Sequence, residues 1–247
     1  MDRSIIRFSH CDKYIYCFSF HNNVSGDSAG RSPSPHCPLC HSYLRFGLLD
    51  APVSIRTPFD NGHAVPYALT IGSMHGPLYI RQTQDCQCVL LRFIIKQLNM
   101  KTSERDNSEL HVGITNSKGV VYNYTMRGIR RDETGWERCV AVRLVQPGAA
   151  NTMNLWDREL ERFALSDMWA PERFHEEREF GTCCYAFALG FINQVRAAGG
   201  KRCLTRDEFT ATHILPRMKT TSTYVQIYRE VLERDFYMID KPRDGTG

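Results

Sequence analysis

Cys184, His111 and Asn123 are of the residue types that form a thiol catalytic site, in which a cysteine attacks a carbonyl carbon and a histidine carries the proton. Cys184 stands at the start of the most regular helical pattern in the chain, CCYAFALGFINQVRAAGG. A helix N-terminus and a neighbouring histidine both lower the pKa of a thiol and so increase the reactive thiolate. This interpretation makes Cys184 the nucleophile, His111 the base and Asn123 the group that orients the imidazole. The substrate would be an amide, a thioester or an ester.

His111 and Asn123 belong to the stretch ELHVGITNSKGVVYNY, which has the pattern of a β-hairpin. If the loop consists of three residues, Asn116 to Lys118, then His111 faces Asn123 across the two strands. Residues opposed in this way have Cβ atoms about 5 Å apart on one face of the sheet, so the amide could hold the ring. A four-residue loop would place Tyr124 opposite His111 and would weaken the pairing.

The same residues also have plain structural interpretations. A histidine on a strand is more often a hydrogen-bonded structural residue than a base, and free cysteine is among the most buried residue types. The alternative hypothesis is therefore a catalytically inactive fold that acts as a protein-binding module. The distance between the Cys184 sulfur and the His111 ring separates the two hypotheses.

Cysteines near the N-terminus predict a second site, a structural zinc centre. Zinc takes four nitrogen or sulfur ligands in a tetrahedron, and a C-x-x-C turn supplies two of them. CPLC is such a turn, and CDKYIYC adds two cysteines at a wider spacing than usual. The predicted ligands are Cys11, Cys17, Cys37 and Cys40. Three neighbouring histidines could each replace one ligand: His10, His36 and His41. The alternative is a proline turn with two core cysteines.

The elements that must position these residues are strands followed by helices, which favours an α+β fold. Alternating or β-rich patterns occur in SIIRF, YIYCFSF, LHVGIT, GVVYNY and RCVAVRLV. Helical spacing occurs in NLWDRELERFALS, in the Cys184 segment, from TRDEF to Pro216 and in TYVQIYREVLERD, and FYMID has the pattern of a closing strand. We predict a zinc-ribbon-like module over 1–48, an α+β domain over 49–240 and a disordered tail over 241–247.

Composition limits the classes of partner. The chain has 247 residues, of which 42% are hydrophobic and 23% charged, with a formal net charge of +4. Because the positive charge is small and dispersed, we predict no binding to nucleic acid. No apolar run approaches the about 20 residues that span a bilayer, and the N-terminus has no signal-peptide pattern. We therefore expect an intracellular protein with reduced thiols, whose partner is another protein or an acyl or amide substrate.

A histidine strand, a polar residue twelve positions later and a distant cysteine that opens a helix together resemble the circularly permuted papain-like fold. NlpC-type peptidases, lecithin:retinol acyltransferase and deSUMOylating isopeptidases share that fold. The resemblance implies an antiparallel sheet packed on a cysteine-bearing helix, with Cys184 as nucleophile, His111 as base and Asn123 as orienting group. One departure is Cys183, which stands where the permuted pattern often has asparagine.

Over nearly its full length the sequence resembles the makorin-2 opposite-strand protein family. The stretches that carry this resemblance are IRFSHCDKYIYCF, CPLC, LLDAPVSI, LHVGITNSKGVVYNY, GWE, QPG, CYAFALGFIN and EFT. The segments 21–35 and 64–87 are longer than the family pattern. The resemblance implies a family and no particular activity.

Overall fold

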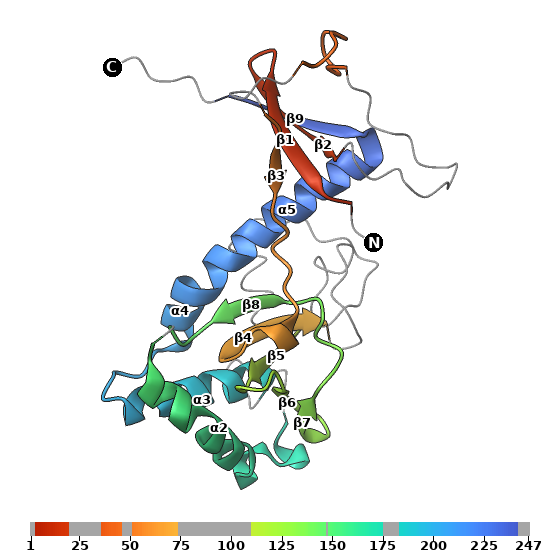
Figure 1. Cartoon of the computed structure of the whole chain (residues 1–247). Coiled ribbons are helices and arrows are strands. Elements are labelled where there is room, and N and C mark those ends of the chain that lie inside the picture. Colours follow the sequence, from red (N-terminus) through yellow and green to blue (C-terminus); the bar gives the residue numbers. More distant parts are fainter. Residues whose placement is uncertain are drawn as a thin grey trace. The chain divides into compact units, whose positions relative to one another are not determined.

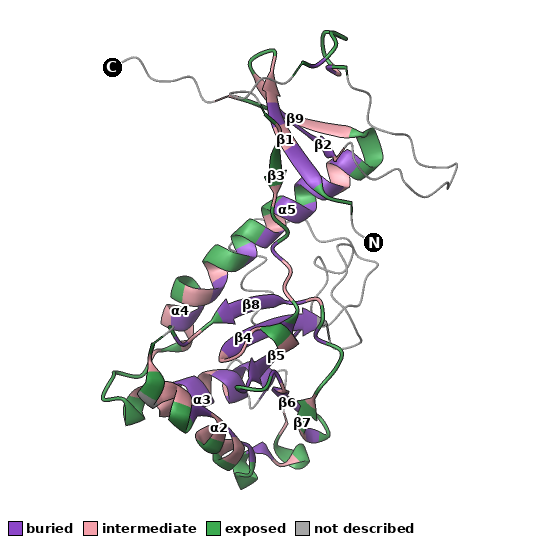
Figure 2. Cartoon of the chain, in the orientation of Figure 1, coloured by how far each residue is buried: buried purple, intermediate pink, exposed green. Residues whose placement is uncertain are grey.

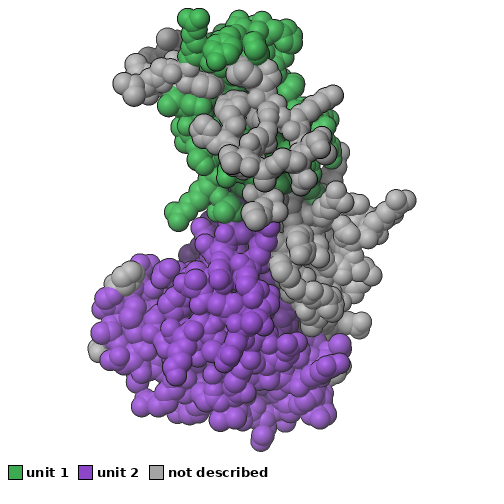
Figure 3. All heavy atoms as spheres, turned by 45° about the vertical axis from the view of Figure 1, so that its right-hand side comes forward, with its two compact units in different colours: residues 1–57, 223–247 green, residues 58–222 purple. Residues whose placement is uncertain are grey.

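The structure is a computed structural model that describes residues 3–19, 36–45, 51–73, 110–146, 148–174 and 183–241. Its strands form two antiparallel sheets accompanied by a few helices (Figure 1), so the α+β prediction is confirmed. The chain divides into two compact units, residues 1–57 with 223–247 and residues 58–222 (Figure 3). The segments 21–35 and 74–87 and the tail residues 242–247 lie outside the described residues.

The first unit contains a four-stranded sheet with the strand order β3-β1-β2-β9. β1 (Ile5–His10) and β2 (Lys13–Phe18) form a hairpin, and β3 (Val53–Ile55) pairs with β1. The two residues of the hairpin turn, Cys11 and Asp12, have φ values of 51° and 57°. Positive φ at both positions is the type I′ geometry, which matches the twist of the flanking strands.

The C-terminal strand also belongs to this first sheet, which differs from the predicted division at residue 48. β9 (Phe236–Asp240) pairs antiparallel with β2 from Lys13 to Cys17. Phe236 and Met238 of β9 pack on the small core of this unit. The hydrogen-bond partner of a strand is a long-range property that the alternation within FYMID does not reveal.

The second unit contains a five-stranded sheet with the order β7-β6-β5-β4-β8 and two helices packed against it. Its strands are β4 (Ala68–Ser73), β5 (Leu110–Thr115), β6 (Val121–Thr125), β7 (Gly128–Asp132) and β8 (Val140–Arg143). Its helices are α2 (Ala150–Ala164) and α3 (Cys184–Ala198), and α3 lies against β5 and β6 (Figure 1). Apolar side chains from both helices and from one face of the sheet form a continuous core, visible as the buried segments of Figure 2.

The remaining helical segments are short turns and one long helix. Single 3₁₀ turns cover Gly62–Ala64, Asp167–Trp169 and Pro171–Arg173. The predicted capping box is present, because Thr205 and Glu208 bond reciprocally at the start of α4 (Arg206–Phe209). A π-helical turn, Thr210–Ile214, follows and leads into α5 (Leu215–Arg234). None of the helices in the described ranges has the length and apolar content needed to cross a membrane.

Pro216 does not end the helix as we expected. It is the second residue of α5, directly after the π-helical turn. Proline cannot donate the usual helical hydrogen bond, and the π-helical turn just before Pro216 alters the hydrogen-bonding pattern at this point of a continuous helical segment. The helical pattern therefore continues to Arg234.

Candidate functional site

Four metal-ligating side chains converge in the first unit: His10, Cys11, Cys37 and Cys40. One ligand atom from each lies within 4.8 Å of the other three. The Cys11 and Cys40 sulfurs lie 3.1 Å and 3.7 Å from Nδ1 of His10. Tetrahedral zinc with bonds of about 2.3 Å separates neighbouring sulfurs by about 3.8 Å. The Cys₃His set therefore has the spacing and the donor atoms to hold a metal ion.

Two tight turns bring these ligands together. His10 and Cys11 lie at the β1–β2 turn. In the CPLC turn, His41 N donates to Cys37 O at 2.9 Å and Leu39 N donates to Cys37 Sγ at 3.4 Å.

The structure does not place Cys17 in this cluster, although the sequence predicted it as the fourth ligand. Cys17 pairs with Ile6 at the far end of the β1–β2 ladder, whereas His10 pairs with Lys13 beside the turn. Four residues of strand put the two ends about 13 Å apart, much farther than a metal–sulfur bond. Cys17 is buried in the core, where desolvation raises the pKa of its thiol to about 12. His10, one of the three named substitutes, occupies the fourth position.

The two exposed cysteines of the cluster differ in acidity. The pKa of Cys40 is lowered to about 6, mainly by a hydrogen bond with the Ser42 side chain, whose Oγ lies 3.3 Å from Cys40 Sγ. A hydrogen bond to Cys40 is the main cause that raises the pKa of Cys11 to about 11. Of the two sulfurs, that of Cys40 is therefore the one that favours the thiolate, the form in which cysteine binds metal.

In the second unit the structure brings His111 and Asn123 together. His111 Nε2 donates to Asn123 Oδ1 at 3.0 Å, and both residues are buried. The register differs from the predicted one, because Gly113 rather than His111 pairs with Asn123. A shift of two residues keeps the same face of the sheet, and a diagonal neighbour is still within reach of a long side chain.

Cys184 is not brought to this pair. α3 packs on the sheet face that carries Val112 and Tyr122, and Cys184 is buried in that core. His111 alternates to the opposite face, where its ring lies 6.1 Å from that of Trp136. The sheet therefore separates the thiol from the imidazole, and the expected sulfur–imidazole contact is not part of this arrangement.

Asp132 and Trp136 surround His111 and Asn123, and neither residue was predicted from the sequence. Asn123 Nδ2 donates to Asp132 Oδ2 at 2.8 Å, and Trp136 Nε1 donates to the same oxygen at 3.2 Å. Arg130 pairs with the other carboxylate oxygen at 3.0 Å. No spacing in the sequence marks this network, because the strand pairing of β6 with β7 creates it.

Comparison with known proteins identifies the relatives of the chain. Residues 77–231 match the family model described as DUF4796 C-terminal. The chain is also 36% identical over 242 residues to the human protein named MKRN2 opposite strand protein, covering 98% of this chain and 92% of that protein. The chain belongs to the MKRN2 opposite strand protein family. This membership confirms the resemblance seen in the sequence.

The MKRN2 opposite strand protein family carries no reaction or ligand in its name, so function must be argued from the sites themselves. No solved structure matches the chain. The permuted papain-like topology accordingly stays a prediction for this member of the family.

Proposed function

We propose that this protein is a non-catalytic binding protein whose first unit is stabilised by a structural zinc ion. The observation that carries the proposal is the convergence of His10, Cys11, Cys37 and Cys40 within 4.8 Å. Small domains bury too little apolar surface to be stable without help, and a bound metal commonly supplies it. The core of this unit is small and includes Cys37 itself, so a metal on that sulfur would be tied directly to the core.

The surface beside the zinc site supports binding of another protein. Leu39 lies inside the CPLC turn and is exposed, and Tyr43 is 61% exposed. The rings of Tyr43 and His36 meet edge to face at 5.4 Å, which restrains the tyrosine. Exposed aromatic residues on a rigid support are frequent anchors of protein interfaces.

The alternative, a thiol hydrolase or acyltransferase, receives less support from the geometry. His111 and Asn123 form the predicted pair, but Cys184 lies in the core on the other face of the sheet. Cys139 lies on the same side of the sheet as His111 but is fully buried. Its pKa is raised to about 12, mainly because burial removes the thiol from water. Both thiols are buried, whereas a cysteine nucleophile needs access to its substrate.

Metal analysis of the purified full chain tests the zinc assignment. We expect one equivalent of zinc in the natural protein, and loss of that zinc in Cys37→Ser and in His10→Ala. His41→Asn is the matched control for the histidine, because it changes a neighbouring histidine outside the cluster and asparagine tolerates its positive φ. Cys17→Ser should also retain zinc. A folded natural protein without metal, or full zinc content in Cys37→Ser, would overturn the assignment.

The binding role has a separate test. Proteins cross-linked to the full chain should be lost in the double variant Leu39→Ser/Tyr43→Ser while its zinc content stays unchanged. Met126→Ser is the control, because Met126 is a 70% exposed apolar residue of the second unit. An identical set of cross-linked proteins in all three forms would contradict binding through the CPLC turn.

A further inference from the structure

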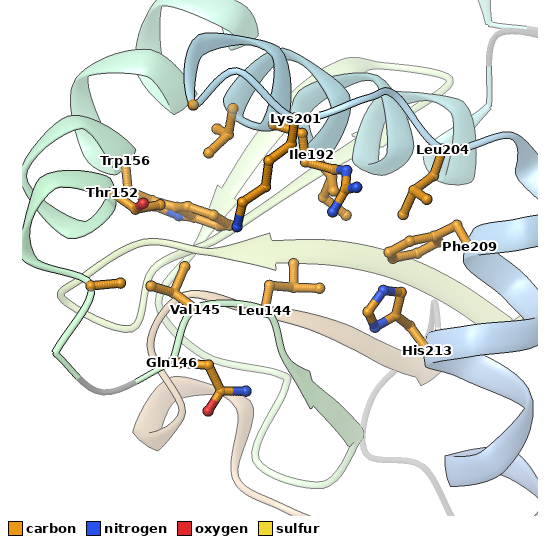
Figure 4. Close-up of a pocket in the computed structure, with 14 residues that line it drawn as sticks. Leu144, Val145, Gln146, Thr152, Trp156, Ile192, Lys201, Leu204, Phe209 and His213 are labelled. Atoms are coloured by element: carbon orange, nitrogen blue, oxygen red, sulfur yellow. The ribbon is translucent and has the colours of Figure 1, made fainter.

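A cavity of about 210 Å³ lies in the second unit, away from both sites described above. It opens between the end of β8, the first turns of α2, the last turns of α3 and the π-helical turn (Figure 4). Its apolar wall includes Trp156, Ile192 and Phe209, all of them buried. An apolar cavity of about 150 Å³ is enough to hold benzene, so this space suits the body of a somewhat larger apolar molecule.

The polar groups of the cavity are cationic. Arg196 and Lys201 both line it, and none of the fourteen lining residues is acidic. Figure 4 shows the Lys201 side chain reaching over the cavity toward Trp156. Across the described part of the chain no carboxylate forms an ion pair with either residue, and Arg196 Nε instead donates to the Arg202 carbonyl at 3.0 Å. An anion in the cavity would therefore meet positive charge that no acidic side chain of the described residues neutralises.

The π-helical turn Thr210–Ile214 supplies one wall. His213 of this turn lies against Phe209, with ring centroids 5.0 Å apart, and both rings face the cavity (Figure 4). Single π-helical turns inside α-helices occur frequently at functional sites because they redirect side chains. Here the turn places an imidazole on the same cavity as the two permanent cations, which adds a third hydrogen-bonding group suited to an acid.

From the apolar wall, the cations and the absence of lining carboxylates, we propose that this cavity binds a small amphipathic acid. The apolar body of the ligand packs against Trp156 and Ile192, and its carboxylate lies at Arg196 and Lys201. The inference is independent of the zinc site, since every lining residue belongs to the second unit.

Calorimetric titration of the full chain with octanoate tests the proposal, and 1-octanol is the neutral probe of the same length. We expect saturable binding of octanoate and weaker binding of 1-octanol. Lys201→Gln should weaken octanoate binding by about threefold, the size of a solvent-exposed charge pair, and leave 1-octanol binding unchanged. Lys118→Gln removes an exposed lysine outside the cavity and should change neither affinity.

A second variant tests the location of the site. Val195→Phe places a ring in the cavity and should abolish binding of both probes while circular dichroism remains that of the natural protein. If this variant does not fold, Lys201→Gln still decides the outcome, because Lys201 is exposed and glutamine keeps a polar side chain at that position. The proposal is overturned if octanoate does not bind. It is also overturned if octanoate and 1-octanol bind equally and Lys201→Gln affects neither.

Discussion

Asn123 connects two polar residues in the interior of the second unit. Its side-chain oxygen accepts from His111 and its nitrogen donates to Asp132, so one amide satisfies a donor and an acceptor at once. Such networks stabilise a fold only while every member has its partner.

Replacing Asn123 with leucine should lower the free energy of unfolding by about 2 kcal/mol, because the N–H of His111 then loses its acceptor inside the protein. Denaturant unfolding measures this change. Met126→Ala, at an exposed position, should change the same free energy by less than about 0.5 kcal/mol. Equal stabilities for the Asn123 variant and the natural protein would mean that the network contributes nothing.

Thiol labelling compares Cys184 with Cys203. Cys184 is 2% exposed, whereas Cys203 is an exposed free cysteine. In native protein, iodoacetamide should modify Cys203 well before Cys184, and His111→Ala should not alter the rate at Cys184, because the sheet lies between the two residues. Mass spectrometry of the labelled peptides gives both rates. Faster reaction at Cys184 in mildly acidic buffer, slowed by His111→Ala, would restore the catalytic hypothesis.

Between elements, the contact of α3 with the π-helical turn depends on Tyr185. Its hydroxyl lies 2.7 Å from Thr210 Oγ1, and burial is the main cause that raises the pKa of Tyr185 to about 12. The neutral phenol is thus favoured in the folded state. Its contribution to stability is fully present below the unfolded pKa of about 10 and is lost as pH rises toward 12.

Tyr185→Phe should therefore reduce the alkaline loss of stability. The variant should be about 1 kcal/mol less stable than the natural protein at pH 8, because it lacks the hydrogen bond to Thr210. This difference should shrink as pH rises from 9 to about 11.5. Denaturant unfolding at several pH values checks both parts, and a difference that stays constant with pH would contradict burial of an ionisable phenol.

At the scale of the whole molecule, the two units differ in the size of their cores. The second unit has a large continuous core between its sheet and helices, whereas the first has a small core beside the four-ligand cluster. Trp136, Trp156 and Trp169 all belong to residues 58–222, so tryptophan fluorescence reports on the second unit alone.

If the four-ligand cluster holds zinc as we propose, removal of the zinc by a chelator should unfold the first unit selectively. We expect a loss of far-ultraviolet circular dichroism without a shift of the tryptophan emission maximum, and recovery of the signal when zinc is restored. Cys37→Ser should resemble the chelated protein and should not respond to the chelator. A red shift of tryptophan emission on chelation would show that the second unit also depends on the metal.

Local patterns in the sequence were sufficient for features whose partners are close in the chain. The CPLC turn, the hairpin around Asn116 and the capping box at Thr205 each depend on residues a few positions apart. Family membership was also recognisable, because it rests on residue identities along the whole chain. These features follow from spacing and turn chemistry alone.

Only the tertiary structure decided which of these residues meet. Cys17 and His10 lie on the same face of the β1–β2 hairpin. His10 stands next to the turn and Cys17 lies near the other end of the strand pair, so only His10 belongs to the four-ligand cluster. His111 and Cys184 each have a fitting residue type, but the face on which α3 packs keeps them apart. Strand pairing and helix packing bring together residues that are far apart in the chain. The face of the sheet on which a side chain lies depends on the strand register, and residue types and spacing do not determine that register.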